Sequence, residues 1–184
     1  MDLVTISSKK GLVNKEETIN DKHLFIDQPK PKTFNCDKKC IIVTARVHPG
    51  EVPSSHVMTG IIDELTKDSE VANTLRDKTV FYIIPILNPD GVARGHYRVD
   101  TNGINLNRCY INPNPKEHSP IYAVKKMIMH LHDNNRYFGF LDLHAHASRK
   151  GMFIYGNSTN ELEKQVETCL FPKILSMNSE NFEY

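Results

Sequence analysis

The chain has 184 residues, of which 39% are hydrophobic and 24% are charged, and its formal net charge is +1 at pH 7. This composition is ordinary for one globular domain with a core, and it excludes a disordered chain. A net charge so close to zero gives no overall field that favours nucleic acid or an anionic membrane, and we expect neither as a partner.

The first predicted elements are strands separated by a long loop. Residues 3–7 alternate apolar and polar side chains, which predicts a short strand, whereas residues 14–39 are polar, contain Pro29 and Pro31, and predict a loop. Residues 41–47 form a run rich in β-branched residues, which is followed by His48. Such a run is typical of a strand buried on both faces of a sheet.

Two helices and a second central strand are expected next. Pro53 suits the first turn of a helix, and apolar residues then recur at helical spacing, so we predict a helix over residues 53–66. Its apolar stripe consists of Val57, Ile61, Ile62 and Leu65. Residues 70–76 predict a shorter helix, and the apolar run 80–87 predicts a strand that ends in the turn sequence Asn88-Pro89-Asp90-Gly91.

The remaining pattern continues the alternation of helices and strands. Residues 121–131 carry a helical stripe, residues 138–143 predict a third buried strand, and residues 152–155 predict a fourth. An amphipathic helix is expected over residues 161–170. Alternating strands and helices indicate an α/β fold with a mainly parallel, mixed sheet flanked by helices.

The cysteines and the apolar runs indicate the cellular compartment in which the protein is expected. The four cysteines are irregularly spaced and too few for a disulfide scaffold, which favours reduced thiols in a cytosolic protein: Cys36, Cys40, Cys109 and Cys169. Cys36 and Cys40 could form half of a zinc site, but no second pair follows them. No apolar run approaches the roughly 18 residues needed to cross a bilayer, and residues 1–10 lack a signal-peptide hydrophobic region.

Three potential metal ligands stand at the ends of predicted strands. His48 and Glu51 lie in the sequence His48-Pro49-Gly50-Glu51, and His144 follows the run 138–143. A single histidine is more often a surface or core residue than a ligand, but open α/β sheets place their sites at strand ends. Two imidazoles and one carboxylate form a catalytic zinc set, with the fourth position left to a water whose pKa falls to roughly 7. We therefore predict a metallohydrolase with one Zn²⁺ per chain.

A second group of polar residues lies between these ligands, in Asn102-Gly103-Ile104-Asn105-Leu106-Asn107-Arg108. An arginine beside an asparagine is suited to holding a carboxylate by two parallel charge-assisted hydrogen bonds. The alternative for such a loop arginine is an ion pair on the surface.

Six blocks taken together resemble the zinc carboxypeptidases, most closely their cytosolic subfamily and its type-five members, which are tubulin deglutamylases able to remove the branch-point glutamate. The resemblance extends from about Leu3 to Tyr184. The blocks, in the order of the family, are His48-Pro49-Gly50-Glu51, Asn88-Pro89-Asp90-Gly91-Val92, Gly95-His96-Tyr97-Arg98, Asn105-Leu106-Asn107-Arg108, Asp142-Leu143-His144 and Phe153-Ile154-Tyr155-Gly156-Asn157.

The resemblance implies roles for residues around the three predicted zinc ligands. It implies that Asn107 and Arg108 hold the terminal α-carboxylate of the substrate, and that Arg98 polarises the scissile carbonyl and stabilises the oxyanion. Asn105 falls where related enzymes often have an aspartate that orients the first zinc histidine. A neutral amide oxygen can accept the same ring N–H, but it raises the basicity of the ligand less.

One element of the family pattern is not found. The family requires a glutamate well beyond the third ligand as general base, and only residues 145–184 follow His144. The glutamates in this segment are expected to be solvated charges: Glu161, Glu163, Glu167, Glu180 and Glu183. We therefore expect residues 1–184 to form a single, N-terminal metal-binding part of an incomplete carboxypeptidase domain, or a naturally shortened protein, that lacks the base.

The expected function is that of a zinc metallocarboxypeptidase that hydrolyses C-terminal or branch-point glutamates on tubulin and similar acidic protein tails. We expect it in the cytoplasm, associated with microtubules. One alternative is a non-catalytic zinc- or peptide-binding module that uses Arg108 without turnover. The other is a zinc amidohydrolase of the aspartoacylase type, which resembles carboxypeptidases in its metal set and its Asn-Arg pair.

Overall fold

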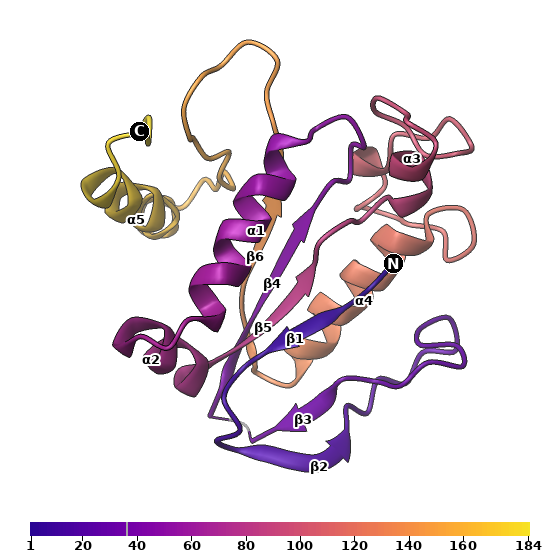
Figure 1. Ribbon diagram of the computed structural model, residues 1–184, viewed down its shortest axis with the longest axis vertical. Helices are drawn as coiled ribbons and strands as arrows, with labels where there is room; N and C mark the ends of the chain where they lie inside the picture. Colours follow the sequence, from indigo (N-terminus) through magenta and orange to yellow (C-terminus); the bar gives the residue numbers. More distant parts are fainter. Residues whose placement is uncertain (36) are drawn as a thin grey trace. The chain divides into compact units, whose positions relative to one another are not determined.

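The computed structural model describes residues 1–35 and 37–184. The chain divides into two compact units, Met1–Ala145 and His146–Tyr184, which are described separately (Figure 1). The first unit contains a four-stranded sheet in the order β1-β5-β4-β6. Its strands are β1 (Val4–Ile6), β4 (Lys39–Ala45), β5 (Thr79–Ile84) and β6 (Tyr137–Leu143).

The sheet is mixed but mainly parallel. β4 pairs in parallel with both β5 and β6, and only β1 runs antiparallel to its neighbour β5. Helices connect the parallel strands, because a parallel pair needs a long crossover connection. The predicted fold class, an α/β structure with a mainly parallel sheet flanked by helices, is confirmed.

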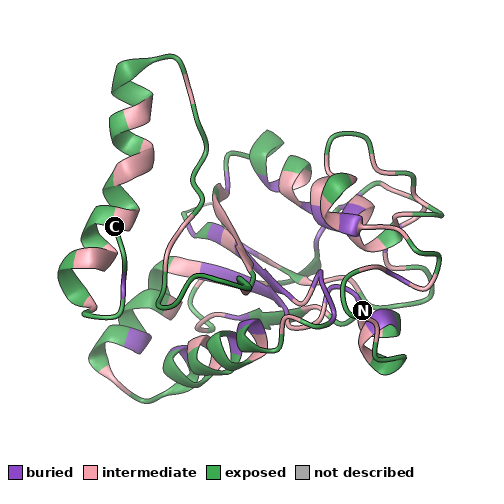
Figure 2. Cartoon of the chain, turned by 90° about the horizontal axis from the view of Figure 1, so that it is seen from above, coloured by how far each residue is buried: buried purple, intermediate pink, exposed green. Residues whose placement is uncertain are grey.

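Successive residues of the central strands face opposite layers of helices. Val43, Phe81 and Ile83 pack in one cluster with side chains of α1 (Pro53–Thr66), while Ile42 and Tyr82 pack in another with side chains of α4 (Ser119–Asp133). The strands are buried on both faces for this reason, which explains why they are continuous apolar runs and not alternating ones. Figure 2 shows the buried residues concentrated in these strands.

The predicted helices form close to their expected bounds. α1 covers the predicted residues 53–66, and the second predicted helix extends two residues further, as α2 (Glu70–Lys78). The predicted stripe of α1 was wrong at Val57, which is exposed, whereas Met58 is buried. β5 ends three residues before the predicted end of its strand, because Pro85 has no N–H to donate to the sheet. The predicted turn that follows begins a short helix, α3 (Pro89–Ala93), which the side chain of Asn88 caps.

The prediction of a loop over residues 14–39 is confirmed for residues 17–31 and was wrong toward both ends. The segment contributes to an antiparallel hairpin of β2 (Leu12–Glu16) and β3 (Lys32–Phe34). Most residues of both strands are exposed, so neither strand needs an apolar face. For this reason neither strand shows the alternation of apolar and polar residues that would have predicted it. Phe34 packs beside Cys40, and the buried carboxylate of Glu17 pairs with the guanidinium of Arg136.

The second unit contains one long helix, α5 (Leu162–Asn178), whose start agrees with the predicted amphipathic helix. The helix has no buried residue, and Pro172 lies inside it. The prediction of a strand over residues 152–155 was wrong, since Met152 forms only a single bridge with Phe182. An apolar run becomes a strand only when neighbouring backbone takes up its hydrogen bonds.

No described helix combines the length and apolar character needed to cross a membrane.

Candidate metal centre

A strained turn after β4 presents the first candidate ligand. Arg46 adopts a left-handed backbone conformation with φ of 58°, which is uncommon for a residue other than glycine. Its guanidinium donates through Nε and Nη2 to the carbonyl oxygen of Pro49, and through Nη1 to Oγ of Ser55. These bonds fasten the loop that carries His48 to the start of α1. This role of Arg46 could not be predicted from the sequence, because the strain is visible only in the backbone angle.

Two glycines let three of the sequence blocks pack against one another. A Cβ atom on Gly91 would lie 2.6 Å from Cγ of Pro49, and one on Gly50 would lie 2.7 Å from the carbonyl oxygen of Tyr97. The backbone N–H of Gly50 donates to that same oxygen at 2.8 Å. Any side chain at either position would push the blocks apart, so the loop before Arg98 is held against the loop that carries the ligands.

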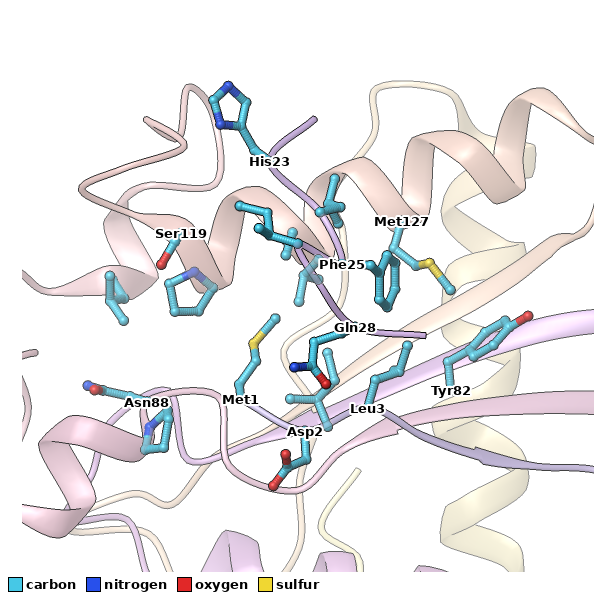
Figure 3. Close-up of a pocket in the computed structure, with 18 of the residues that line it drawn as sticks. Met1, Asp2, Leu3, His23, Phe25, Gln28, Tyr82, Asn88, Ser119 and Met127 are labelled. Atoms are coloured by element: carbon cyan, nitrogen blue, oxygen red, sulfur yellow. The ribbon is translucent and has the colours of Figure 1, made fainter. Parts of the chain in front are cut away.

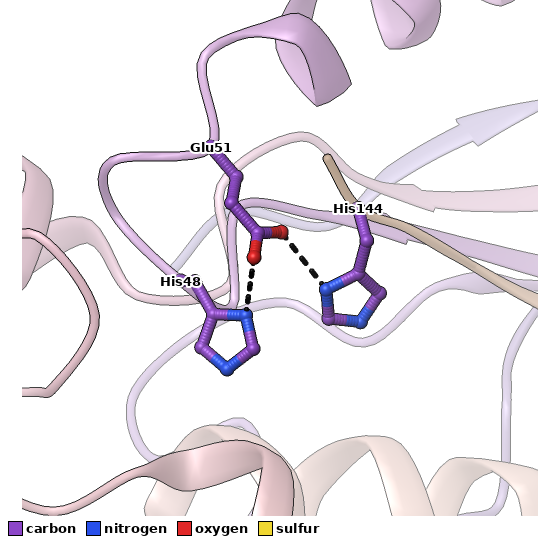
Figure 4. Close-up of side chains that lie close together, drawn as sticks. All are labelled: His48, Glu51 and His144. Atoms are coloured by element: carbon purple, nitrogen blue, oxygen red, sulfur yellow. Dashed lines mark hydrogen bonds and ion pairs between the residues drawn. The ribbon is translucent and has the colours of Figure 1, made fainter. Parts of the chain in front are cut away.

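The three predicted ligands lie together although 93 residues separate Glu51 from His144 (Figure 4). Nδ1 of His48 lies 2.8 Å from Oε1 of Glu51, and Nδ1 of His144 lies 2.9 Å from Oε2 of the same carboxylate. One ligand atom from each residue fits within 4.8 Å of the others. His48 is buried, Glu51 is half-buried and His144 is exposed, so the cluster opens to solvent on one side. A mononuclear zinc site that reacts with a substrate has this donor set and an open side.

The outer nitrogens of both rings also have partners. Nε2 of His48 lies 3.1 Å from Oδ1 of Asn105, which is the contact expected for that asparagine. Nε2 of His144 lies 2.9 Å from Oδ2 of Asp142. The sequence analysis quoted Asp142 only as part of a block. Its position two residues before His144 was a usable signal, since residues i and i+2 of a strand share a face.

Electrostatics in the cluster favour a cation. Burial disfavours the ionised form of Glu51, but hydrogen bonds from His144, His48 and the N–H of Ala145 outweigh it and hold the pKa of Glu51 well below its usual range. Burial lowers the pKa of His144, whereas hydrogen bonds to Asp142 and Glu51 and the charges of these two carboxylates raise it, with a net value of about 9. Without a metal, the ring of His144 therefore carries a proton between two carboxylates at neutral pH.

The predicted substrate-binding residues occupy different positions relative to the cluster. Nη1 of Arg98 lies 3.8 Å from Oε1 of Glu51, and 43% of the Arg98 side chain is exposed. Asn107 and Arg108 belong to the short helix η1 (Leu106–Arg108), which the buried Leu106 anchors to the core. Arg108 is exposed, and its Nη1 donates to the carbonyl oxygen of its neighbour Asn107 at 3.1 Å. The structure thus brings Arg98 to the cluster and leaves Arg108 facing solvent.

A cavity lies on the α4 face of the sheet (Figure 3). Its volume is about 780 Å³, and its walls include Leu3, Tyr82 and Met127. None of the residues predicted for the metal or substrate site lines it. This cavity is therefore separate from the candidate metal site.

The cysteines among the described residues are not part of the metal cluster. Cys40 is buried in the core, and burial raises the pKa of its thiol, which disfavours the thiolate that binds metals. Cys36 lies outside the described residues, so the prediction of half a zinc site at Cys36 and Cys40 is not tested at Cys36. Cys40, Cys109 and Cys169 are free thiols.

The sequence is similar to those of known carboxypeptidases. The family model of the zinc carboxypeptidases matches residues 1–181. Cytosolic carboxypeptidase 6 of Mus musculus is 40% identical over 163 residues, which cover 88% of this chain and 30% of that protein. Cytosolic carboxypeptidase-like protein 5 of Bos taurus is 31% identical over an alignment of 271 residues, which covers all of this chain and 30% of that protein. The chain thus spans about a third of the length of these relatives.

Solved structures show the same architecture. A metallo-carboxypeptidase from Burkholderia cenocepacia superimposes with a TM-score of 0.71 at 26% identity, over 80% of this chain and 40% of that one. An aspartoacylase family protein from Mesorhizobium loti superimposes with a TM-score of 0.53 at 15% identity, over 71% of this chain and 39% of that one. The second likeness shows a shared fold alone.

Proposed function

The chain belongs to the zinc carboxypeptidase family, and we propose that it carries the metal-binding part of a carboxypeptidase that removes C-terminal or branch-point glutamates from acidic protein tails, such as those of tubulin. The observation that carries this proposal is the cluster of His48, Glu51 and His144, in which both Nδ1 atoms face one carboxylate. The names of the relatives, which are cytosolic carboxypeptidases, support an action in the cytoplasm. Association with microtubules is part of the same proposal.

The donor set of this cluster fits a single zinc ion. His48, Glu51 and His144 would hold the ion, and their ligand atoms lie within 4.8 Å of one another. Zinc bound in this way supplies an acidified water and polarises a carbonyl group. A ligating imidazole is neutral, so a bound cation would displace the extra proton of His144. The cation would also replace the hydrogen bonds that both histidines make to Glu51.

Two arginines would act on the substrate. Arg98 extends toward solvent beside Glu51, where its N–H groups can meet the oxygen of the scissile carbonyl and stabilise the negative charge that develops on it. Arg108 and Asn107 would hold the terminal α-carboxylate, because a guanidinium donates two parallel hydrogen bonds to a carboxylate. This pairing would restrict the enzyme to chain ends.

We also propose that this chain alone lacks the general base. In the described residues, the carboxylates that contact the two histidines of the cluster are Glu51 and Asp142, and both are engaged by hydrogen bonds. The five glutamates of the second unit that were considered as candidates are all exposed. A non-catalytic module that binds zinc or a peptide remains the alternative that this observation favours, whereas the aspartoacylase type has support only from the fold.

Zinc content tests the ligand set. We expect one zinc per wild-type chain and none in His48→Ala or His144→Ala, measured by metal analysis after gel filtration. His132→Ala is the matched control, because that side chain is exposed on α4. His130 is a poorer control, since its Nε2 contacts the buried carboxylate of Glu17 at 3.2 Å. Stoichiometric zinc in both ligand variants would remove the basis of the proposal.

Peptide binding tests the carboxylate clamp. A glutamate-tailed peptide should bind the zinc-loaded chain more weakly after Arg108→Ala, by about 2 to 5 kcal/mol if the pair is desolvated. Arg108→Lys should also bind poorly, because an ammonium group cannot reproduce the planar fork. The same peptide with a C-terminal amide is the control ligand, and it should bind wild type and Arg108→Ala equally. An N-acyl amino acid tested in parallel separates the aspartoacylase alternative.

A further inference from the structure

The two histidines of the cluster differ in the group that holds the outer ring nitrogen. From this difference we propose that Asp142, aligned by Thr44, is a positioning residue that directs Nδ1 of His144 to the metal. The inference rests on the proposed function, because it requires that the cluster binds zinc.

The alignment of Asp142 follows from the register of the sheet. Thr44 on β4 and Asp142 on β6 are partners in neighbouring parallel strands, so their side chains lie on the same face at the same level. Oγ1 of the fully buried Thr44 donates to Oδ1 of Asp142 at 2.7 Å. The second oxygen, Oδ2, lies 2.9 Å from Nε2 of His144. Each oxygen of the carboxylate thus has its own partner, and the group cannot rotate without losing one of the two bonds.

This arrangement determines which nitrogen of His144 is available. A neutral imidazole has one N–H, and an ionised carboxylate can only accept a hydrogen bond. The proton of a ligating His144 therefore stays on Nε2, where Asp142 accepts it, and Nδ1 keeps its lone pair. Nδ1 is the atom that faces Glu51, at 2.9 Å.

His48 shows why a charged partner is needed on only one of the two rings. His48 is buried, so the surrounding side chains fix its ring, and the neutral Asn105 suffices as the partner of its Nε2 at 3.1 Å. His144 is exposed just beyond the end of β6, where packing restrains the ring less. Asp142 and Thr44 supply by hydrogen bonds the restraint that packing supplies to His48.

Zinc affinity of the 184-residue chain, measured by competition with a chromophoric chelator, tests the proposal. Asp142→Asn should bind zinc about 10- to 100-fold more weakly, as is typical when a partner of a metal-bound histidine is changed. Thr44→Val should weaken binding in the same direction by less. Asn105→Asp should change the affinity much less, because packing already fixes the ring of His48. Asp133→Asn, which removes an exposed carboxylate from α4, is the control and should bind as wild type does.

A second measurement separates positioning from a general electrostatic or folding effect. In the zinc-loaded chain labelled with nitrogen-15 histidine, the Nε2–H of His144 should be protected from exchange with solvent. Asp142→Leu, loaded with excess zinc, should lose this protection while the Nε2–H of His48 keeps its own. A wild-type chain that binds no zinc overturns the proposed function and this inference with it. Zinc binding by wild type together with unchanged affinity in Asp142→Asn, or unchanged protection in Asp142→Leu, overturns this inference alone.

Discussion

The two units of the chain use apolar residues in different ways. In Met1–Ala145, strands and helices bury their apolar faces against one another, and side chains such as Leu131 are fully buried. In His146–Tyr184, α5 has the same kind of apolar stripe but no buried residue, and side chains such as Leu170 are exposed. Periodicity therefore predicts that a helix forms, whereas burial depends on whether a complementary surface packs against it.

The two units also differ in the chemical groups that they contain. The three candidate ligands and the partners of their ring nitrogens all belong to the first unit. The second unit contributes glutamates that are exposed to solvent, including Glu161 and Glu183. A carboxylate acts as a general base only when it is positioned within hydrogen-bonding distance of the proton that it takes.

The largest expected effect concerns turnover. If the glutamates of the second unit are solvated charges, the zinc-loaded chain should release glutamate from a tubulin-tail peptide about 100- to 10,000-fold more slowly than a full-length cytosolic carboxypeptidase, because a positioned acid-base group is missing. The assay is glutamate release with and without a chelator. Chelator-sensitive release at the rate of the full-length enzyme would contradict the comparison. The residues to change next would then be Glu161, Glu163, Glu167, Glu180 and Glu183.

The second prediction compares one truncation in each unit. Leu131 on α4 is fully buried and Leu170 on α5 is 59% exposed, so the same change removes a core side chain in one helix and a surface side chain in the other. Leu131→Ala should lower the free energy of unfolding by about 2 to 5 kcal/mol. Leu170→Ala should change it by less than about 0.5 kcal/mol. Urea denaturation followed by circular dichroism measures both, and an equal loss in the two variants would show that α5 is packed.

The sequence predicted the central fold well for a physical reason. Residues 41–45 and 80–84 are mostly apolar on both faces because both faces are covered, and such runs can be recognised in the sequence without knowledge of the neighbouring strands. The hairpin of β2 and β3 escaped prediction because its attachment depends on a few distant contacts, such as the pair of Glu17 and Arg136. The run 152–155 was predicted as a strand for the opposite reason, since its local apolar pattern suits a strand but the folded chain pairs it only through one bridge of Met152.

Some features of the candidate site could also be predicted from the sequence, and others could not. His48, Glu51 and His144 could be predicted because donor type and position at strand ends are both visible in the sequence. The left-handed turn at Arg46 could not, because it is a property of the folded backbone. The role inferred for Asp142 depends on the register that brings Thr44 beside it, which a single sequence does not specify.

The third prediction concerns metal removal. A ligand that binds only the folded state stabilises it by RT ln(1 + [L]/Kd), which is about 2.7 kcal/mol when free zinc is a hundred times its dissociation constant. Because the ligands follow β4 and β6, chelation should speed amide hydrogen exchange in these strands and leave α5 unchanged. Hydrogen exchange read by mass spectrometry, with and without a chelator, provides the comparison. Faster exchange in α5 alone would show that the metal stabilises the second unit, and it would contradict the prediction.

The smallest expected effect is a pH dependence from a buried lysine of the first unit. Lys38 is buried, and burial lowers its pKa below the ordinary value of 10.5 although Nζ donates to Ser7, to Ser8 and to the carbonyl oxygen of Arg76. Between the lowered pKa and 10.5 the unfolded chain binds more protons at this residue than the folded chain does, so this group makes stability rise with pH in that window. The raised pKa of the Cys40 thiol acts with the opposite sign, because its contribution is lost as pH rises.

The contribution of Lys38 is therefore isolated by a difference between variants and not by the slope of wild type alone. The difference in unfolding free energy between wild type and Lys38→Met should increase in favour of wild type as pH rises toward 10.5, when urea denaturation is repeated at several alkaline pH values. Lys39→Met is the control, because that neighbouring side chain is exposed and should leave the difference independent of pH. A flat difference for Lys38→Met would mean that its hydrogen bonds compensate fully for burial, and that a buried charge in the first unit behaves like the solvated charges of the second.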